Sequence, residues 1–300
     1  MSDLLVVRPE VREALERRHA VVALETTLIS HGFPAGEGAE VGRESERRVR
    51  AAGAVPATIG ILDGKLRIGL SDEDLQRFDE AGADARKVGP RDLGAALAQG
   101  ALGATTVGGT LAAMRIAGIG FMGTGGLGGV HRGFPDPPDV SADLGELARA
   151  EALVVSAGVK SLLDVPKTME LLETLGIPVL GYRTDEVPLF YAARGGGPVS
   201  ARVESPAEAA EIARAHWSLG RHSAIVLARP PDESLDDVEP LIEQALAAAG
   251  AKSVSGQAVT PFVLAYLHEH SGGRTAAANK ELVAANAGLA GEVAVAYAGR

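Results

Sequence analysis

The chain has 300 residues, of which 46% are hydrophobic, so it is long enough to bury a substantial core. Its formal net charge of −10 argues against a nucleic acid polymer as a partner, because the two polyanions would repel, although a local pocket can still bind a small anion. The absence of cysteine excludes disulfides, thiolate metal sites and a cysteine nucleophile, and without a signal-peptide core or a membrane-length apolar stretch we expect a cytoplasmic protein with no membrane contact.

The first third of the chain is predicted to form helices, a strand and a hairpin. Helical periodicity after Pro9 gives way to the apolar strand VVALE, which ends at Glu25. A strongly charged helix is expected from about Glu37 to Ala52. The segment PATIGILDGKLRIGL is typical of a β-hairpin, because Asp63-Gly64 tolerates the positive φ angles of a type I′ turn.

From Ser71 onward, helices and strands alternate. Ser71 and Asp74 form a pattern like a capping box at the start of one helix. Further helices are expected near residues 92–100, 109–117, 141–150, 167–175, 206–218 and 236–249, with strands at TTV, IGFMG, ALVVSAG, IPVLGY and SAIVLA. Repeated βα units predict a largely parallel sheet flanked by helices on both faces, an α/β/α sandwich. No linker is visible, so residues 1–300 are expected to form a single catalytic domain that C-terminal helices close.

Three segments are expected to meet at one site, because ligands in such folds bind beyond the carboxyl ends of the strands. Glu25, Gly123 and Lys160 all fall at predicted strand ends, and Lys160 ends the apolar run EALVVSAGVK. A desolvated lysine loses part of its preference for the charged form, and a neutral amine attacks a sugar or keto carbonyl. The alternative is a lysine that simply leaves the sheet for water.

Other titratable residues near this edge have two interpretations each. Glu25 follows four apolar residues, so desolvation would raise its pKa into the range of a proton donor, unless it is a satisfied strand-end carboxylate. His31 in SHGFP suits proton transfer or the capping of a turn. Lys87 offers a phosphate contact, although Arg86 and Arg91 beside it suit an ordinary basic surface equally well.

A glycine-rich loop follows the strand IGFMG. Its residues 123–128, GTGGLG, match the G-x-G-x-x-G pattern of dinucleotide sites. That pattern requires a helix to begin inside it, whereas three prolines in VHRGFPDPPD delay the next helix until about Ser141, so the match is weak. The loop suits either backbone contacts to a phosphate or sugar, or a plain flexible connection. No G-x-S-x-G or Walker motif is present, so serine-hydrolase and P-loop mechanisms are excluded.

Asp139, Ser141 and Asp143 lie around the predicted start of the following helix. Asp139 or Ser141 suits a helix cap. Alternatively, a carboxylate here binds a hard divalent cation such as Mg²⁺ or Mn²⁺, but not Zn²⁺, because the histidine spacing typical of zinc is missing.

Taken together, long blocks of the chain resemble one family. These blocks are ALETTLISHGFP, PATIGILDGKLRIGL, KVGPRDL, TTVGGTLAAM, GTGGLGGVHRG, DVSADLGEL, VVSAGVKSLLD and TPFVLAYLHEHSGG with AAANKELVAANA. From about residue 5 to 290 their order resembles the pseudouridine-5′-phosphate glycosidases, also called the indigoidine synthase A-like family. The resemblance implies reversible conversion of pseudouridine 5′-phosphate and water into uracil and ribose 5-phosphate, with a divalent metal, usually Mn²⁺, in a typically trimeric α/β/α protein.

The resemblance also implies roles for individual residues. A C-glycosidic carbon is a poor leaving group, so protonation alone does not break its bond, and an iminium at C1′ supplies the missing electron sink. The resemblance assigns this nucleophile to Lys160, the proton donor to Glu25 and the metal position to Asp139. The residues expected to contact the substrate are Lys87, Val107, Ser141, Ala142 and Asp143, joined around the phosphosugar and base by Thr124, His131 and Asn279.

The chain departs from the family pattern at two places. Gly38 stands where the family often has an asparagine, and Gly89-Pro90 stands where Ser-Arg is common. These changes concern the pocket entrance and base recognition, while the blocks of Lys160 and Glu25 are unaltered. Two other functions stay open: a Schiff-base lyase or aldolase that acts on a related phosphosugar or C-nucleotide, and a non-catalytic nucleotide-binding module built on the glycine loop.

Overall fold

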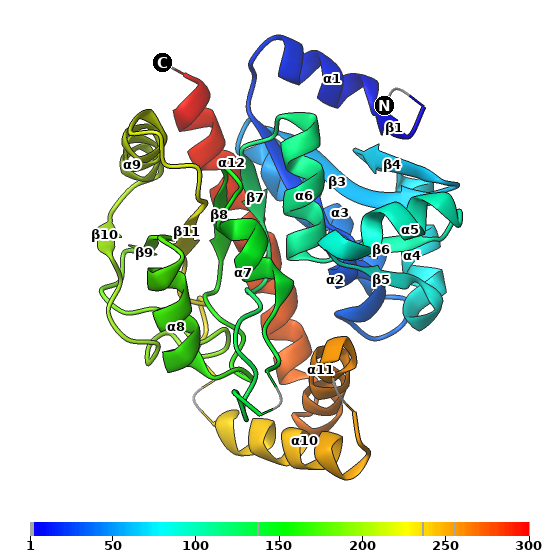
Figure 1. Ribbon diagram of the computed structural model, residues 1–300, viewed down its shortest axis with the longest axis vertical. Coiled ribbons are helices and arrows are strands. Elements are labelled where there is room, and N and C mark those ends of the chain that lie inside the picture. Colours follow the sequence, from blue (N-terminus) through cyan, green and yellow to red (C-terminus); the bar gives the residue numbers. More distant parts are fainter. Residues whose placement is uncertain (1–2, 137, 236, 255, 300) are drawn as a thin grey trace.

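A computed structural model describes residues 3–136, 138–235, 237–254 and 256–299, which form a twisted sheet between two layers of helices (Figure 1). The described strands are β1 (Leu5–Val7), β2 (Val21–Glu25), β3 (Val55–Leu62), β4 (Lys65–Ile68), β5 (Arg86–Val88), β6 (Gly103–Thr105), β7 (Phe121–Gly123), β8 (Leu153–Ser156), β9 (Val179–Tyr182), β10 (Ala201–Val203) and β11 (Ile225–Ala228). Along the main path their order is β1-β4-β3-β2-β7-β8-β11-β9-β10, with β6 joined to β3 and β5. Only β3 pairs antiparallel with its neighbours β4 and β6 in the described sheet, which confirms the prediction of a largely parallel sheet.

Helices cover both faces of the sheet. They are α1 (Pro9–Glu16), α2 (Thr27–His31), α3 (Gly38–Ala51), α4 (Asp72–Ala81), α5 (Leu93–Ala98), α6 (Val107–Ala117), α7 (Ala142–Leu147), α8 (Val165–Thr174), α9 (Pro206–Ser218), α10 (Glu239–Ala251), α11 (Val259–His270) and α12 (Arg274–Ala298). Alternate residues of β2 pack against opposite helix layers. Val21 and Ala23 share a core with α1, α6, α7 and α8, whereas Val22 and Leu24 share another with α3, α9 and α12. The predicted α/β/α sandwich is therefore confirmed.

Local sequence signals have the geometry that they predict. Asp63 and Gly64 both have positive φ angles, 54° and 71°, in the turn between β3 and β4. At the start of α4, the Asp74 N–H donates to the Ser71 hydroxyl and the Ser71 N–H donates to the Asp74 carboxylate, each over 3.1 Å. The hairpin and the capping box therefore form as expected, because both depend on residues within a few positions of each other.

Several element boundaries differ from the prediction. The three-residue strands β1, β5 and β10 were not anticipated, because so few residues carry no measurable alternation. The predicted strand TTV is placed two residues too far along the chain, because β6 ends at Thr105 and Val107 already begins α6. The Thr106 hydroxyl caps this helix by accepting from the Gly109 N–H. Asp236, at the predicted start of the helix near 236–249, and Pro137, in the proline-rich loop, lie outside the described residues.

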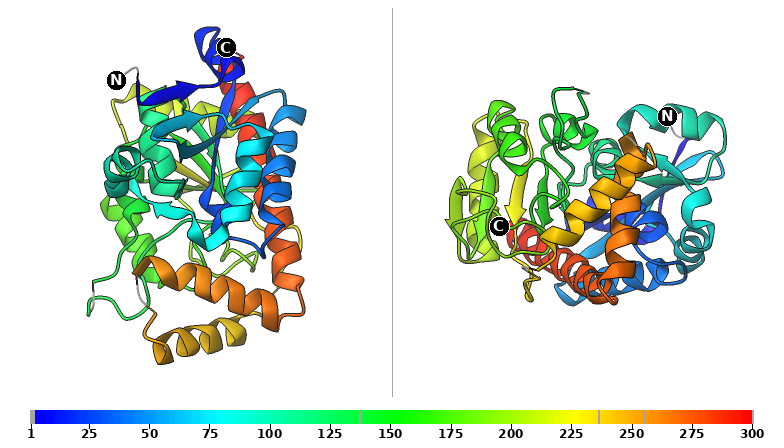
Figure 2. Two further views of the ribbon diagram at one scale, coloured as in Figure 1. Left: turned by 90° about the vertical axis from the view of Figure 1, so that its right-hand side faces the viewer. Right: turned by 90° about the horizontal axis from the view of Figure 1, so that it is seen from below.

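Helices α10 and α11 lie beyond one end of the sheet, below it in Figure 1, and cross in front of the other elements when the molecule is seen from below (Figure 2). This is the end at which the strands β2, β7 and β8 finish, because residues of α11 line a cavity together with Glu25. Of the helices described, none is long and apolar enough to cross a lipid bilayer.

Candidate active site

The carboxyl ends of the strands converge on a small cavity. Glu25 is the last residue of β2, Lys87 is the central residue of β5, and Lys160 follows the end of β8 by four positions. All three line a cavity of about 70 Å³, as does Gly126 of the glycine loop. The structure therefore brings together the three distant segments that were expected to meet, and it adds a fourth through Lys87.

Lys160 does not belong to the strand that the apolar run suggests. Strand β8 stops at Ser156, and Gly158 has a φ of +82°, at a point where a Cβ atom would lie 2.0 Å from the Pro188 carbonyl oxygen. Beyond this kink the chain runs beside the glycine loop, and the Lys160 N–H donates to the Leu127 carbonyl over 3.2 Å. The half-buried lysine is thus held against the loop rather than released into water.

The carboxyl group of Glu25 is buried and accepts a hydrogen bond on Oε1 from the Thr124 hydroxyl. Burial raises the pKa of Glu25 to about 7, although the charge of Lys160 and the hydrogen bond from Thr124 act in the opposite direction. A carboxyl group with this pKa holds a proton for part of the time at neutral pH. It can therefore donate a proton, as the sequence suggested.

Lys87 is the second amine of the cavity. Burial lowers the pKa of Lys87 to about 8, with a further contribution from the charge of Lys160, while Asp143 and Glu25 oppose the shift. Lys87 is therefore not part of an ordinary basic surface. It lines the cavity together with the carboxyl groups of Glu25 and Asp143 and the amine of Lys160. An anionic ligand would favour its charged form.

Asp143 ties two elements of the site together. Its Oδ1 accepts from the Gly108 N–H over 2.8 Å, and its Oδ2 accepts from the Gly128 N–H over 2.9 Å. The Ser141 hydroxyl caps α7 by accepting from the Asp143 N–H over 3.2 Å, so the capping interpretation describes Ser141. Asp143 lines the cavity, whereas Ser141 and the exposed Ala142 do not.

The glycine loop is packed rather than flexible. Residues 121–130 are all buried, and the glycines between 123 and 129 have none of the positive φ angles found elsewhere in the described chain. A Cβ atom would lie 2.7 Å from Ala287 Cα at Gly123 and 2.5 Å from the Phe190 ring at Gly126. Close approach of other elements thus explains the glycines, and the dinucleotide interpretation fails because the next helix, α7, begins only at Ala142.

His131 is near enough to Lys160 and Lys87 for their charges to act on it, and Asp139 lies beside His131, but neither residue lines the cavity. The His131 Nδ1 is 3.8 Å from the Asp139 Oδ2, and the Asp139 side chain is 35% exposed. Among the described residues, no group of three or more acidic or histidine side chains is arranged around a common point. A cation on Asp139 would therefore keep most of its ligands as water, which fits Mg²⁺ or Mn²⁺ rather than a fully enclosed metal.

Two neutral residues complete the predicted set. Asn279 of α12 is fully buried and lines the cavity, and within the described chain neither its Nδ2 nor its Oδ1 has a hydrogen-bond partner. Such an amide is costly to bury unless something else bonds to it. Val107, at the first position of α6, lines the same cavity.

Other residues that line the cavity were predicted weakly or not at all. His31 lines the cavity, but its ring is anchored by the Ala85 carbonyl 3.0 Å from Nε2, and burial lowers its pKa. Phe190, which has a φ of +61°, places its ring against the glycine loop. No local pattern predicts Phe190 or the α11 residues Pro261 and Leu264, because tertiary packing alone brings them here.

A second cavity of about 520 Å³ adjoins the first. The two share four lining residues, which are His31, Gly32, Pro261 and Leu264. Small-molecule sites usually enclose about 300–1,000 Å³, so the first cavity alone is too small for a nucleoside monophosphate. The four shared residues therefore lie between the small cavity, which holds Glu25 and the two lysines, and the second cavity, which is large enough for a small-molecule ligand.

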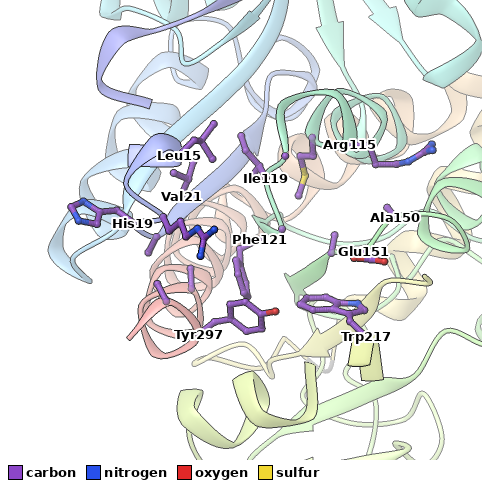
Figure 3. Close-up of a pocket in the computed structure, with 18 of the residues that line it drawn as sticks. Leu15, His19, Val21, Arg115, Ile119, Phe121, Ala150, Glu151, Trp217 and Tyr297 are labelled. Carbon is purple, nitrogen blue, oxygen red and sulfur yellow. The ribbon is translucent and has the colours of Figure 1, made fainter. Parts of the chain in front are cut away.

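The largest of these cavities, about 900 Å³, lies at the opposite end of the sheet (Figure 3). Its aromatic wall consists of Phe121, Trp217 and Tyr297, which meet edge to face. Among its charged groups, Arg115 and Arg149 pair with Glu146, and His222 pairs with Glu151. No lysine is among the described residues that line it, so it offers no counterpart to the amines near Glu25.

The raised pKa of Glu25 predicts a pH-dependent stability. Since the folded-state pKa of about 7 exceeds the usual 4.5, folding favours the protonated form, and the free energy of unfolding falls as the pH rises from about 4.5 to 7. Glu25→Gln should remove this loss and stabilise the fold above pH 7 by roughly 2–3 kcal/mol, with little effect near pH 4. Urea unfolding at pH 4.5, 7 and 8.5 measures the difference; an equal effect at all three values would contradict it.

The chain is similar to known proteins over nearly its whole length. A family model described as "Indigoidine synthase A like protein" matches residues 10–296. A protein of Herpetosiphon aurantiacus named pseudouridine-5′-phosphate glycosidase is 47% identical over 97% of this chain and 97% of its own length. A protein of the same name from Streptomyces griseus is 48% identical, over 96% of this chain and 91% of its own.

Two solved structures are similar over nearly the whole chain. One is the prealnumycin C-glycosynthase AlnA in complex with ribulose 5-phosphate, with 41% identity, a TM-score of 0.89, and coverage of 99% of this chain and 97% of the other. The other is an indigoidine synthase A-like protein from Thermotoga maritima, with 38% identity, a TM-score of 0.87, and coverage of 97% and 96%.

Proposed function

Because the chain belongs to the indigoidine synthase A-like family, we propose that it reversibly cleaves the C-glycosidic bond of pseudouridine 5′-phosphate to give uracil and ribose 5-phosphate. The observation that carries this proposal is the cavity in which the amines of Lys160 and Lys87 face the carboxyl group of Glu25. Relatives that share nearly the whole chain bear the name of this activity. The nucleoside phosphate and its two products are the proposed small-molecule partners.

In the proposed mechanism, Lys160 supplies the electron sink. Its nitrogen bonds to C1′ of the ribose as the C1′–O4′ bond breaks, and Glu25 gives its proton to the ring oxygen. The Glu25 carboxylate then takes a proton from the adduct nitrogen, and the freed lone pair expels C5 of uracil. C5 takes up that proton, and an iminium is left at C1′. Water hydrolyses the iminium, which releases ribose 5-phosphate and restores the amine.

The remaining polar groups suit the two ends of the substrate. We propose that the ammonium form of Lys87 contacts the phosphosugar, and that the unpartnered amide of Asn279 pairs with a uracil edge, donor to acceptor. The other substrate contacts implied by the resemblance stay proposals at Val107, His131, Ser141, Ala142 and Asp143, whereas the Thr124 hydroxyl already donates to Glu25.

The direct test is to incubate the purified protein with pseudouridine 5′-phosphate and Mn²⁺ and to follow free uracil. Failure to release uracil, with and without metal, would overturn the substrate assignment. Borohydride trapping of ribose 5-phosphate on Lys160 without uracil release would instead indicate another Schiff-base lyase or aldolase. Nucleotide binding without trapping or release would indicate a binding module.

A second candidate is C-glycoside synthesis with an acceptor other than uracil. It is favoured by the AlnA neighbour, which is named for C-glycoside formation and is 41% identical to this chain. Incubation of the protein with ribose 5-phosphate and either uracil or other carbon nucleophiles distinguishes the two. The glycosidase proposal expects uracil to be by far the best acceptor.

We propose that Asp139 binds a divalent cation, Mn²⁺ or Mg²⁺, which would neutralise phosphate charge beside the amines. Asp139→Asn should lower the Mn²⁺ affinity by about 10-fold or more, because it removes the only negative side chain that we assign to the ion. Electron paramagnetic resonance of free Mn²⁺ measures this without substrate. Asp136→Asn, an exposed change in the same loop, is the control, and an equal loss in both variants would contradict the assignment.

We further propose a single catalytic domain and a cytoplasmic location, as expected from the sequence, and a homotrimer, which the family resemblance implies. Sedimentation equilibrium tests the last. A trimer would have three times the 30.7 kDa mass of one chain, whereas the mass of a single chain would contradict it.

A further inference from the structure

Thr124 is held between three elements of the fold. It follows β7, and its N–H donates to the Val155 carbonyl of β8 over 3.0 Å. Its own carbonyl accepts from the Nδ2 of Asn286, on α12, over 2.8 Å. The remaining polar group, the hydroxyl, donates to Oε1 of Glu25. Since all four of these residues are buried, water does not compete for these bonds.

Asn286 fixes the backbone on which Thr124 sits. Its Nδ2 also approaches the Gly125 carbonyl, at 3.4 Å, so one amide holds two successive peptide groups. Helix α12 leaves no room for the loop to shift, because a Cβ atom at Gly123 would already lie 2.7 Å from Ala287 Cα. With its backbone held by these contacts, the Thr124 hydroxyl lies where it donates to Oε1 of Glu25.

We propose that Thr124 and Asn286 are positioning residues for the proton donor Glu25. Asn286 fixes the peptide groups at Thr124, and the Thr124 hydroxyl occupies Oε1, which leaves Oε2 as the oxygen that carries the exchangeable proton. The inference rests on the proposed function for its consequence in catalysis. It assigns the Thr124 hydroxyl to Glu25 rather than to the substrate.

The charged groups around Glu25 affect the pKa of its carboxyl group. Lys160, Lys87 of β5 and Asp143 of α7 act on its carboxyl group, and His31 of α2 lines the same cavity. On its other side, uncharged residues of α3, β3 and α12 surround it, and these are Val41, Gly42, Ser45, Thr58 and Val283. The hydrogen bond from Thr124 lowers the pKa of Glu25, so its removal should move the pKa upward.

The test compares Thr124→Val, Thr124→Ser and Asn286→Ala with the wild type. Thr124→Val keeps the shape of the side chain but removes the donor, so kcat for uracil release should fall roughly 10- to 100-fold with KM nearly unchanged. The decline of the rate at high pH should move upward by about half a pH unit or more. Thr124→Ser, which keeps the hydroxyl, should restore the wild-type pH profile, and Asn286→Ala should lower kcat in the same direction.

Thr110→Val is the matched control, because Thr110 is equally buried and its hydroxyl donates to the Thr105 hydroxyl over 2.9 Å rather than to Glu25. It should leave the pH profile unchanged. An identical profile in Thr124→Val and wild type, or an equal shift in the control, would overturn the positioning role.

A readout that needs no turnover separates this inference from the proposed function. The Glu25 carboxyl carbon can be titrated by ¹³C nuclear magnetic resonance in ligand-free protein, with its signal identified by its loss in Glu25→Gln. The inference expects a higher titration midpoint in Thr124→Val and a wild-type midpoint in Thr124→Ser. If this shift occurs but the wild type releases no uracil, the positioning role stands and the proposed function fails; an unshifted midpoint rejects the positioning role whatever the activity.

Discussion

Lys160→Ala is expected to release uracil from pseudouridine 5′-phosphate at least about 10⁴-fold more slowly than the wild type, because removal of a covalent nucleophile abolishes the step that depends on it. The variant should fold normally, since Lys160 is half-buried and its backbone N–H, not its side chain, bonds to the glycine loop. Ultraviolet or chromatographic detection of uracil measures the rate, and circular dichroism checks the fold.

The matched control is Lys167→Ala, which removes an exposed lysine of α8 paired with Asp164. It should keep nearly the wild-type rate, because surface ion pairs contribute little. Release by Lys160→Ala at the wild-type rate would remove Lys160 from the mechanism. Borohydride trapping followed by peptide mass spectrometry then identifies the reacting amine, and an adduct on Lys87, whose pKa is lowered to about 8, would exchange the roles of the two lysines.

Glu25→Gln is expected to reduce the rate of uracil release by roughly 10²- to 10⁴-fold, the usual contribution of a positioned proton donor. Glutamine keeps the shape of the side chain but has no proton to give to the ring oxygen. In the wild type the rate should decline as the pH rises through about 7, since the protonated form of Glu25 is the active one. The residual rate of the variant should lack this decline.

Glu46→Gln is a demanding control for the Glu25 result. Glu46 of α3 is also a largely buried carboxyl group that accepts from a threonine, Thr58, over 2.6 Å, and burial raises its pKa as well. It does not line the cavity of Glu25 and Lys160, so the variant should retain nearly full activity. Equal losses in both variants, or an unfolded Glu25→Gln protein, would indicate a structural role for buried carboxyl groups instead of proton donation.

Part of the candidate site was predictable from residue patterns alone. Glu25 ends a run of apolar residues, and a run of this kind marks where a buried strand finishes. The distance in sequence between the GTGGLG segment and the next helix, α7, likewise argues against a dinucleotide site. These inferences held because each depends on neighbours in the chain, and neighbours in the chain stay neighbours in the fold.

Other features depended on contacts between distant segments. Lys87 lies on the three-residue strand β5, whose sequence suits a basic surface equally well, and only its pairing with β6 places the amine inside. The glycines of residues 123–128 suggested a ligand loop or a flexible connection, but Ala287 and Phe190, far along the chain, explain them.

The sequence by itself determined the α/β/α architecture, the hairpin turn, the capping box and the family, since periodicity, turn chemistry and long blocks of family-like sequence are properties of local segments. Tertiary structure alone decided that Thr124 bonds to Glu25, that Asn286 holds Thr124, and that α11 closes the cavity. It also decided the pKa of Glu25, because burial is the largest cause of that shift. Burial is produced by every element that packs around a group, so no single segment of the chain encodes it.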